Sequence, residues 1–299
     1  MKSLITGISG FVGNYLKQRL LSLGNDVFGI DHNCHDKDTF QADITDKDKL
    51  SSIIKDVQPD EIYHLAGIAN VAHDKMSEYY TVHALGTLNL YEAVQKAGIN
   101  PKILYVSTSN VYGIVSEKHQ PITENQPLVP ANHYGASKAA GEMISYKYIA
   151  DGLNIVITRS FNHTGPGQSE SFIIPKLVRA FALKQPALEL GITHTKRDFT
   201  DVRDVVRAYH ILVQKARSGD VYNVCSGKAH SIDEIISYLT NLTGHSIRIK
   251  HADSLKRSVD PLLFVGDNQR LKKLGWSEEI PIEQTIKDMI NVYKQPHNG

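Results

Sequence analysis

The sequence predicts an α/β fold built on a doubly wound parallel sheet, and three observations support that prediction. Glycines recur at three-residue spacing after the first apolar segment, as Gly7, Gly10 and Gly13. An acidic residue, Asp31, follows about 20 residues later, where a second apolar run ends. Up to residue 160, short apolar runs alternate with segments of helical periodicity, which is the pattern of parallel strands joined by helices.

Residues 1–13 predict a strand, a phosphate-binding loop and the start of a helix. Gly7 allows a sharp turn, Gly10 leaves room for a pyrophosphate, and Gly13 lets the helix pack closely on the sheet. The free N–H groups at the start of that helix would face the phosphates. The carboxylate of Asp31 would hold the hydroxyls of an adenosine ribose. A dinucleotide cofactor is therefore expected at the end of the first strand.

Apolar periodicity and turn residues divide the first 160 residues into strands and helices. Gly24 and Gly98 each end a predicted helix, and Thr45 is expected to cap a helix that Pro59 terminates. The helix that starts near Lys75 carries two apolar stripes, which predicts two buried surfaces. The predicted strands are 27–31, 61–67, 102–107 and 154–160, and the predicted helices are 10–23, 45–57, 75–97 and 134–151.

After residue 160 the alternation ends, and the sequence predicts a smaller C-terminal α/β lobe beside a Rossmann sheet. A helix is predicted at 171–184, followed by an irregular stretch to Thr200. Ser231 and Glu234 form a capping box at the start of another helix, and Pro281 precedes the last one. The expected dinucleotide-binding domain is 1–160 with roughly 200–226, and the expected substrate lobe is 161–199 with 227–299.

Composition limits the compartment and the partners. The chain has 299 residues with a formal net charge of +1, so no global field favours nucleic acid or an anionic membrane, and an anionic ligand must be held by local arginines. Two cysteines, Cys34 and Cys225, make no disulfide framework, and no targeting or membrane-spanning segment is apparent, so a reduced, cytoplasmic location is expected. The polar cluster 32–36 is interpreted as a loop, and no metal site is predicted.

A hydroxyl, a phenol and an amine fall where the cleft of such a fold should lie. Thr108 follows a predicted strand at its carboxyl end, and Tyr134 opens a predicted helix. Lys138 lies four residues after Tyr134, so the two side chains share one helix face. The ammonium could stabilise a phenolate, lower the pKa of the tyrosine toward the working range and anchor the ribose of a cofactor.

With these motifs in this order, the sequence resembles the extended short-chain dehydrogenase/reductases that act on nucleotide sugars. The resemblance covers essentially the whole chain and rests on the segments 6–13, 64–67, 86–90, 134–138 and 197–204. Within that family, the segments 161–168, 197–203 and 219–227 resemble the GDP-4-keto-6-deoxy-D-mannose reductases.

The resemblance assigns roles to individual residues. Tyr134 would be the general acid, Lys138 its partner, and Thr108 the hydroxyl that polarises the sugar carbonyl. The implied substrate-binding residues are Ser109, Asn162, Arg179, Arg197 and Arg257. The implied cofactor-binding residues are Gly7, Gly10, Phe11, Val12, Asp31, Asp43, Ile44, Leu65, Ala66, Tyr134 and Lys138.

Two departures from the family pattern bear on activity. Sugar 4,6-dehydratases of the family carry Asp-Glu after the threonine, whereas Ser109 and Asn110 stand here, which argues against dehydration. An asparagine usual on the long helix is replaced by His83. The replacement puts in doubt any solvent relay that the family assigns to that asparagine.

The expected activity is reduction of the 4-keto group of GDP-4-keto-6-deoxy-D-mannose to GDP-D-rhamnose by a reduced nicotinamide cofactor. A sister reductase giving the 6-deoxytalose epimer and an NAD-dependent 4-epimerase use the same residues and stay open, as does the nucleotide base. A dinucleotide-binding sensor is the alternative outside enzymes. NADH is favoured over NADPH because Asp31 would repel a 2′-phosphate. A homodimer is expected, since the helices at 75–97 and 134–151 carry more apolar positions than one sheet face can cover.

Overall fold

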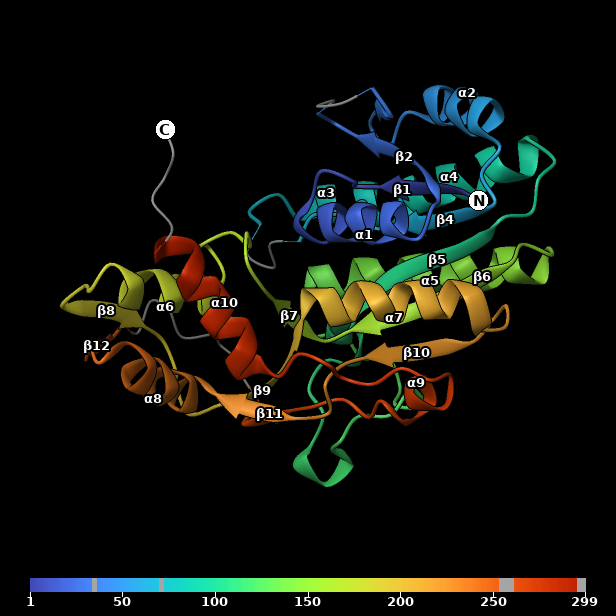
Figure 1. Ribbon diagram of the computed structural model, residues 1–299. Helices are drawn as coiled ribbons and strands as arrows, with labels where there is room; N and C mark the ends of the chain where they lie inside the picture. Colours follow the sequence, from blue (N-terminus) through green and yellow to red (C-terminus); the bar gives the residue numbers. More distant parts are fainter. Residues whose placement is uncertain (34–36, 70–72, 253–260, 295–299) are drawn as a thin grey trace.

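The fold is organised around a seven-stranded parallel sheet (Figure 1). The computed structural model describes residues 1–33, 37–69, 73–252 and 261–294. The strand order is β3-β2-β1-β4-β5-β6-β10, and every pairing in it is parallel, which confirms the predicted fold class. The strands are β1 Lys2–Thr6, β2 Asp26–Asp31, β3 Thr39–Gln41, β4 Glu61–His64, β5 Lys102–Thr108, β6 Ile155–Ser160 and β10 Val221–Val224.

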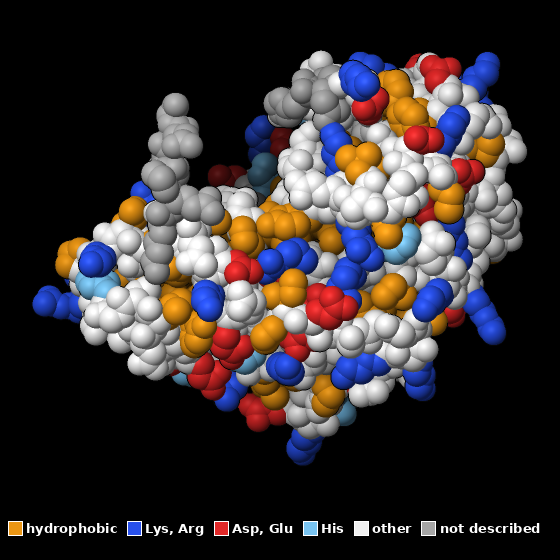
Figure 2. Space-filling view, in the orientation of Figure 1, with side chains coloured by type: hydrophobic (Ala, Val, Ile, Leu, Met, Phe, Trp, Pro, Cys, Tyr) orange, Lys and Arg blue, Asp and Glu red, His pale blue; other side chains and the backbone are white. Residues whose placement is uncertain are grey.

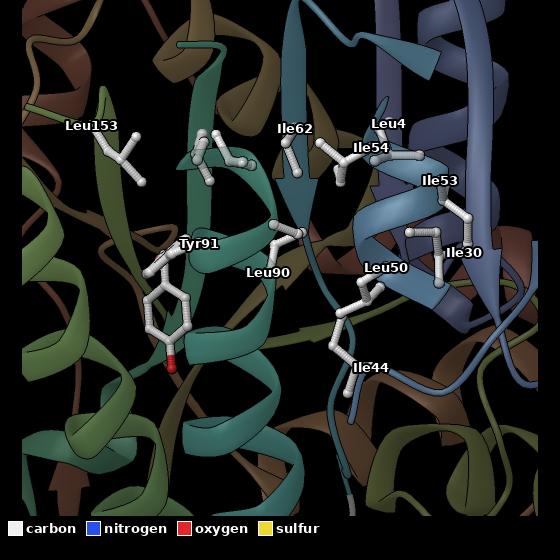
Figure 3. Packing of buried hydrophobic residues seen from close by; sticks show 14 of the residues in the cluster. Leu4, Ile30, Ile44, Leu50, Ile53, Ile54, Ile62, Leu90, Tyr91 and Leu153 are labelled. Atoms are coloured by element: carbon white, nitrogen blue, oxygen red, sulfur yellow. The ribbon is translucent and has the colours of Figure 1, made fainter. Parts of the chain in front are cut away.

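Helices cover both faces of the sheet, because neighbouring strand residues point to opposite sides and both are apolar. Leu4 packs with the helices of one face, whereas Ile5 packs with those of the other. Figure 3 shows the first of these cores, in which Leu50 and Leu90 of two different helices meet the strands. The first face carries α2 Lys47–Val57, α4 Gly86–Lys96 and α5 His133–Ala150, and the second carries α1 Phe11–Ser22 and α7 Val202–Lys215.

The strand order reverses between β1 and β4. From β1 the chain moves outward through β2 and β3, and from β4 it moves in the opposite direction through β5 and β6. The loops that leave β1 and β4 therefore diverge and open a crevice at the carboxyl ends of the strands. Ligands of doubly wound folds bind at such a switch point.

Two helices differ in detail from their prediction. The cap of α2 is Asp46, whose carboxylate accepts a hydrogen bond from Lys49 N at 3.0 Å, and not Thr45. Thr45 instead donates through its backbone and its hydroxyl to Asp43. The long helix predicted at 75–97 is present as α3 Met76–Tyr80 and α4, but a π-helical turn, Thr81–Leu85, separates them.

The smaller part of the structure has its own core, formed by three helices and a short sheet (Figure 1, lower left). The stretch to Thr200 was predicted to be irregular, and this is wrong: it contains β8 Ala187–Leu190 and the start of β9 Lys196–Asp201. The helices are α6 Ile173–Ala182, α8 Ile232–Thr243 and α10 Ile282–Lys294, with a short α9 at Gln269–Lys273. The remaining strands are β7 Asn162–Thr164, β11 Ala229–Ser231, β12 Arg248–His251 and β13 Leu263–Phe264.

The capping box at the start of α8 is present, with Ser231 and Glu234 in reciprocal hydrogen bonds. No helix within the described ranges is long and apolar enough to cross a membrane.

Asp204 on α7 ties the sheet to the C-terminal segment that follows α9. Its fully buried carboxylate accepts hydrogen bonds from the backbone N–H groups of Glu279 and Ile280, both at 2.9 Å, and pairs with Arg207 at 2.7 Å. Its carbonyl oxygen accepts a bond from the indole of Trp276. One aspartate thus accepts hydrogen bonds both from α7 and from the segment that follows α9, and holds the two together.

Replacement of this aspartate should be costly. Asp204→Ala leaves two backbone donors and a guanidinium without their acceptor, so we expect the free energy of unfolding to fall by about 3 kcal/mol. Urea denaturation followed by circular dichroism measures the change. Asp56→Ala, at an exposed position of α2, is the control and should change it by less than about 0.5 kcal/mol. Equal midpoints for the two variants would contradict the assignment.

Candidate active site

The carboxyl ends of β1, β4, β5 and β6 lie at one edge of the sheet because these strands are parallel and paired in register. Thr6 pairs with His64, and Thr108 pairs with Ser160. The segments that follow these residues carry most of the predicted site, from the glycine loop to Asn162. The structure thus brings together residues that are more than 150 positions apart.

The glycine loop leaves no room for side chains at two of its glycines. Gly7 has φ +76°, and a Cβ on it would lie 3.0 Å from the backbone of Ala66. A Cβ on Gly13 would lie 2.3 Å from the carbonyl oxygen of Gly7. Gly10 precedes α1 without any side-chain cap, and the first turn has no acidic residue. The N–H groups at Phe11 and Val12 therefore form an N-terminus suited to an anion.

Asp31 is placed beside this loop at the end of β2. Its carboxylate accepts a hydrogen bond from Ser9 N at 3.0 Å and another from Asn33 N at 3.4 Å. The side chain is only half-buried, so the carboxylate has room to accept further bonds. Asp31 therefore orders the glycine loop as well as being available to a ribose, a second role that the sequence alone did not indicate.

The other predicted cofactor residues follow β3 and β4. Thr6 accepts a bond from Ala66 N on its hydroxyl at 3.1 Å, and its carbonyl accepts one from Leu65 N. Ile44 is buried, and a Cβ on Gly86 of α4 would lie 2.6 Å from it. Asp43 precedes Ile44 in the loop after β3.

Tyr134 lies half-buried in the first turn of α5, with the hydroxyl of Thr108 close enough to lower the pKa of its phenol. The helix starts there because Asn132 caps it, accepting a bond from Gly135 N at 2.7 Å. Burial raises the pKa of Tyr134 above 10, and the nearby hydroxyl of Thr108 offsets this in part. The expectation that Lys138 brings this pKa down is therefore wrong for the protein without ligands. The cost of removing the phenolate from water is larger than the lowering effect of the Thr108 hydroxyl.

Lys138 is buried, and its ammonium donates to the carbonyl oxygen of Val106 on β5 at 2.9 Å. Burial lowers its pKa to about 8, against an opposing effect of Glu142 one turn along the helix. The amine is therefore close to half protonated at mildly alkaline pH.

Two asparagines that sequence reasoning did not assign to the site connect these groups. The amide of Asn110 donates to the hydroxyl of Thr108 at 3.1 Å, and Asn132 donates to the amide oxygen of Asn110 at 3.4 Å. This chain links the end of β5 to the cap of α5 and so sets where Tyr134 meets Thr108. Asn132 stands two residues before Tyr134, and its capping preference is the signal that could have identified it. Ser109 is buried in the 3₁₀ turn Ser109–Tyr112.

The predicted substrate residues other than Ser109 fall into three groups. Asn162 on β7 and Arg197 on β9 lie in two strands that pair with each other, and the Asn162 amide donates to Asp198 O at 3.2 Å. Arg179 on α6 instead forms an ion pair with Glu170 at 3.0 Å. Arg257 lies outside the described residues.

The segment after Asn162 packs across the start of α1. The ring of His163 stacks on that of Phe11, with centroids 6.4 Å apart, and Tyr15 donates a hydrogen bond to Pro166 O at 2.8 Å. The substrate side and the glycine loop are thereby in contact. Figure 2 shows the surface hollowed between the two parts of the molecule, with hydrophobic, basic and acidic side chains around the hollow.

Among the described residues no group of three or more His, Cys, Asp or Glu side chains could hold a metal ion. The part of the polar cluster at 34–36, with Cys34, lies outside them. Cys225 is buried and not in a disulfide, and burial raises the pKa of its thiol well above the ordinary value.

Comparison with known proteins agrees with this geometry. Residues 4–289 match the family described as GDP-mannose 4,6 dehydratase. The chain belongs to this family. It is 34% identical to GDP-6-deoxy-D-mannose reductase of Pseudomonas aeruginosa, with 96% of this chain and 95% of the relative covered. It is 32% identical to GDP-6-deoxy-D-talose 4-dehydrogenase of Aggregatibacter actinomycetemcomitans, with 91% and 90% covered.

Among solved structures, that of RMD from Pseudomonas aeruginosa complexed with NADPH superposes with a TM-score of 0.86 at 33% identity, covering 98% of this chain and 97% of that one. These matches confirm the resemblance to the extended short-chain dehydrogenase/reductases that the motifs predicted, and to the reductases of GDP-linked 6-deoxy sugars within them.

Proposed function

We propose that the protein is a reductase that uses NADH or NADPH to reduce the 4-keto group of GDP-4-keto-6-deoxy-D-mannose to GDP-D-rhamnose. The observation that carries the proposal is the half-buried phenol of Tyr134 beside the buried hydroxyl of Thr108, on the same helix face as Lys138 and at the crevice of a dinucleotide fold. The names of the Pseudomonas and Aggregatibacter relatives support a GDP-linked 6-deoxy sugar as the substrate.

The site's own residues supply the proton and the orientation. Thr108 and Tyr134 would both donate to the ketone oxygen, which polarises the carbonyl and holds one face of the sugar toward the cofactor. A reduced nicotinamide, when bound, supplies the hydride that adds to carbon 4. As charge develops on the oxygen, Tyr134 gives up its phenolic proton, and the product is an alcohol. The positive charge of Lys138 stabilises the phenolate left behind.

The residues at the carboxyl ends of β1 and β2 support the binding of a dinucleotide cofactor. Gly7, Gly10 and the uncapped N-terminus of α1 would hold the diphosphate, and Asp31 the adenosine ribose. Asn162 and Arg197 would contact the sugar nucleotide, and Arg179 would have to leave Glu170 to join them. Roles for Arg257, Asp43 and Ile44 stay predictions.

Dehydration is disfavoured by the side chains that follow Thr108. Elimination of water needs an acid and a base beside the sugar, whereas Ser109 is buried in its turn and the amide of Asn110 is engaged with Thr108 and Asn132. A reductase giving the 6-deoxytalose epimer is the second candidate, since the Aggregatibacter relative carries that name. Two further alternatives differ from a reductase in that they cause no net oxidation of reduced cofactor. A 4-epimerase would regenerate its cofactor in each turnover, and a dinucleotide-binding sensor would consume none.

Incubation of the protein with GDP-4-keto-6-deoxy-D-mannose and NADH or NADPH tests the proposal. We expect one equivalent of reduced cofactor to be oxidised per sugar, and NMR of the product to show the rhamnose configuration at carbon 4. The matching dTDP and UDP sugars are the controls for the base. A talose product supports the second candidate, and bound sugar without loss of absorbance at 340 nm would overturn the reductase.

The proton donor is tested by three substitutions. Tyr134→Phe keeps the ring and deletes the acid, so turnover should fall about 10² to 10⁴-fold while cofactor affinity is kept. Thr108→Val should cost less because the Tyr134 hydroxyl still polarises the ketone, and Thr108→Ser should be nearly silent. Steady-state turnover and fluorescence titration of NADH separate the two effects. Parental turnover by Tyr134→Phe would show that another residue is the acid.

The pH dependence should report Lys138. Its amine is protonated below a pKa of about 8 and neutral above it, so kcat/KM should fall as the pH rises through 8, by about tenfold per unit beyond. The guanidinium of Lys138→Arg stays charged over this range, so that variant, although slower, should lose the alkaline limb. The same limb in both proteins would assign it to a different group.

Cofactor choice is proposed to favour NADH, with NADPH as the competitor that the complex of the Pseudomonas protein indicates. Because Asp31 also holds Ser9 N, the clean substitution is Asp31→Asn, which keeps an acceptor and removes the charge. The ratio of kcat/KM for NADPH over NADH should rise roughly tenfold or more, the size of one like-charge interaction. An unchanged ratio, or a parental preference for NADPH, would contradict the role of Asp31.

A homodimer through α3 and α5 is also proposed. Five large apolar side chains of these helices and the π-helical turn are exposed: Met76, Tyr80, Leu85, Met143 and Tyr146. A second copy packed as a helix bundle would bury them. Met143→Glu should therefore convert the dimer to monomers in sedimentation at micromolar concentration. Leu183→Glu, at an equally exposed position (both 52%) on the smaller part, is the control and should stay dimeric.

A further inference from the structure

His83 occupies the centre of the π-helical turn and is only 1% exposed. A π-helical turn inserts one extra residue into a helix and redirects the side chains around it, and such turns occur frequently at functional sites. The carbonyl of His83 is held by the hydroxyl of Thr87 at 2.5 Å, so the turn is fixed on the α4 side. The imidazole is thereby directed toward the loop that leaves β4 and toward α5.

One ring nitrogen of His83 holds the loop after β4. Ile68 N donates to Nε2 at 2.9 Å. A backbone N–H can only donate, so Nε2 carries no proton and the single proton of the neutral ring is on Nδ1. This loop contains Leu65 and Ala66, which border the cofactor crevice, and Ile68 lies two residues beyond.

The other ring nitrogen holds α5. Nδ1–H donates to Ser137 Oγ at 2.8 Å, and the Ser137 hydroxyl donates to the carbonyl oxygen of Tyr134 at 2.9 Å. Ser137 lies between Tyr134 and Lys138 in the sequence. One imidazole therefore joins the loop on the cofactor side to the backbone of the tyrosine that supplies the proton.

The fit around the imidazole is tight. A Cβ on Gly67 would lie 3.0 Å from Nε2 of His83 and 3.2 Å from Nζ of Lys138, so the loop passes in contact with both groups. The rings of His83 and Tyr134 meet edge to face with centroids 5.6 Å apart, and Tyr79 packs against both. A shift of the imidazole would move the loop, the phenol or both.

The ring is neutral throughout the working range. Burial, followed by the nearby Lys138 and His64, lowers the pKa of His83 to about 2. The groups that face it from the packed elements are Lys138 and Tyr134 of α5, Tyr79 of α3 and His64 of β4. The donor and acceptor roles of Nδ1 and Nε2 therefore do not change with pH.

We propose that His83 is a positioning residue, which sets the distance between the cofactor-side loop and Tyr134 through its bond to Ile68 N. The inference rests on the proposed reductase function. It assigns a role to the imidazole at the position where the family resemblance leads us to expect an asparagine. The amide of asparagine lies at the level of Nδ1 and reaches Ser137, whereas reaching Ile68 N takes an atom at the level of Nε2.

Two substitutions separate the bonds. His83→Asn keeps a donor for Ser137 and loses the bond to Ile68, and His83→Gln places its amide oxygen at the level of Nε2 and loses the bond to Ser137. If the bond to Ile68 sets the geometry, His83→Gln should stay within about threefold of the parent, and His83→Asn should lose about tenfold to a hundredfold in kcat, as for a misplaced reacting group. His210→Gln, a half-buried histidine of α7, controls for removal of an imidazole.

The experiment measures kcat, KM and the kinetic isotope effect with 4-deuterated NADH or NADPH, together with cofactor affinity by fluorescence titration and thermal stability. Slow turnover of His83→Asn with an enlarged isotope effect, weaker cofactor binding and rescue in His83→Gln supports the proposal. Parental kinetics in His83→Asn, or equal losses in both variants that follow their thermal stability, overturns it. The fluorescence titration needs no sugar. Weaker cofactor binding by His83→Asn than by His83→Gln therefore tests the role of His83 even if no keto sugar is reduced.

Discussion

The interaction of the Thr108 hydroxyl with the Tyr134 phenol is the contact on which the candidate site depends. It joins the last residue of a central strand to the first turn of a helix, and neither element alone determines where the two hydroxyls lie. The Asn110–Asn132 link fixes the turn to the helix cap, and His83 fixes the same helix to the neighbouring loop. Two separate links thus fix the first turn of α5, from which the phenol projects.

Burial acts on the phenol and the amine of this site in opposite directions and favours the neutral form of each. The pKa of Tyr134 is raised and that of Lys138 is lowered. A tyrosine held as phenol is the state that a proton donor needs at the start of a reduction. The pKa of Lys138, by contrast, is about 8, so part of the amine is neutral at mildly alkaline pH. A bound diphosphate or ribose that attracts the ammonium would complete its protonation. Ligand binding and the charge of the site are in this way linked.

Much of the large sheet could be predicted because each of its signals is local. The glycine loop and Asp31 are recognisable from spacing, and runs such as Ile103 to Val106 leave little alternative to a buried strand. β9 was missed because its sequence, KRDFTD, is polar, and its buried Asp198 accepts bonds from Ser226 and Gly227, far along the chain. The expected effect of Lys138 on Tyr134 was wrong because the cost of burial cannot be read from a spacing of four residues. The Asn110–Asn132 link likewise required knowing that two loops meet.

The path of the chain between its two parts has a consequence for synthesis. After β6 the chain enters the smaller part, and it returns to the sheet only with α7 and β10, which pairs with β6 through Val221 and Ile157. While the protein is being made from its N-terminus, β6 is therefore an unpaired edge until residue 224 has left the ribosome. Every residue of β6 is buried in the finished protein, so a ribosome-bound intermediate exposes an unpaired strand edge that begins with three apolar residues and can pair with another chain. A pause in translation between residues 160 and 224 should thus promote aggregation of the nascent protein more than a pause at a later codon.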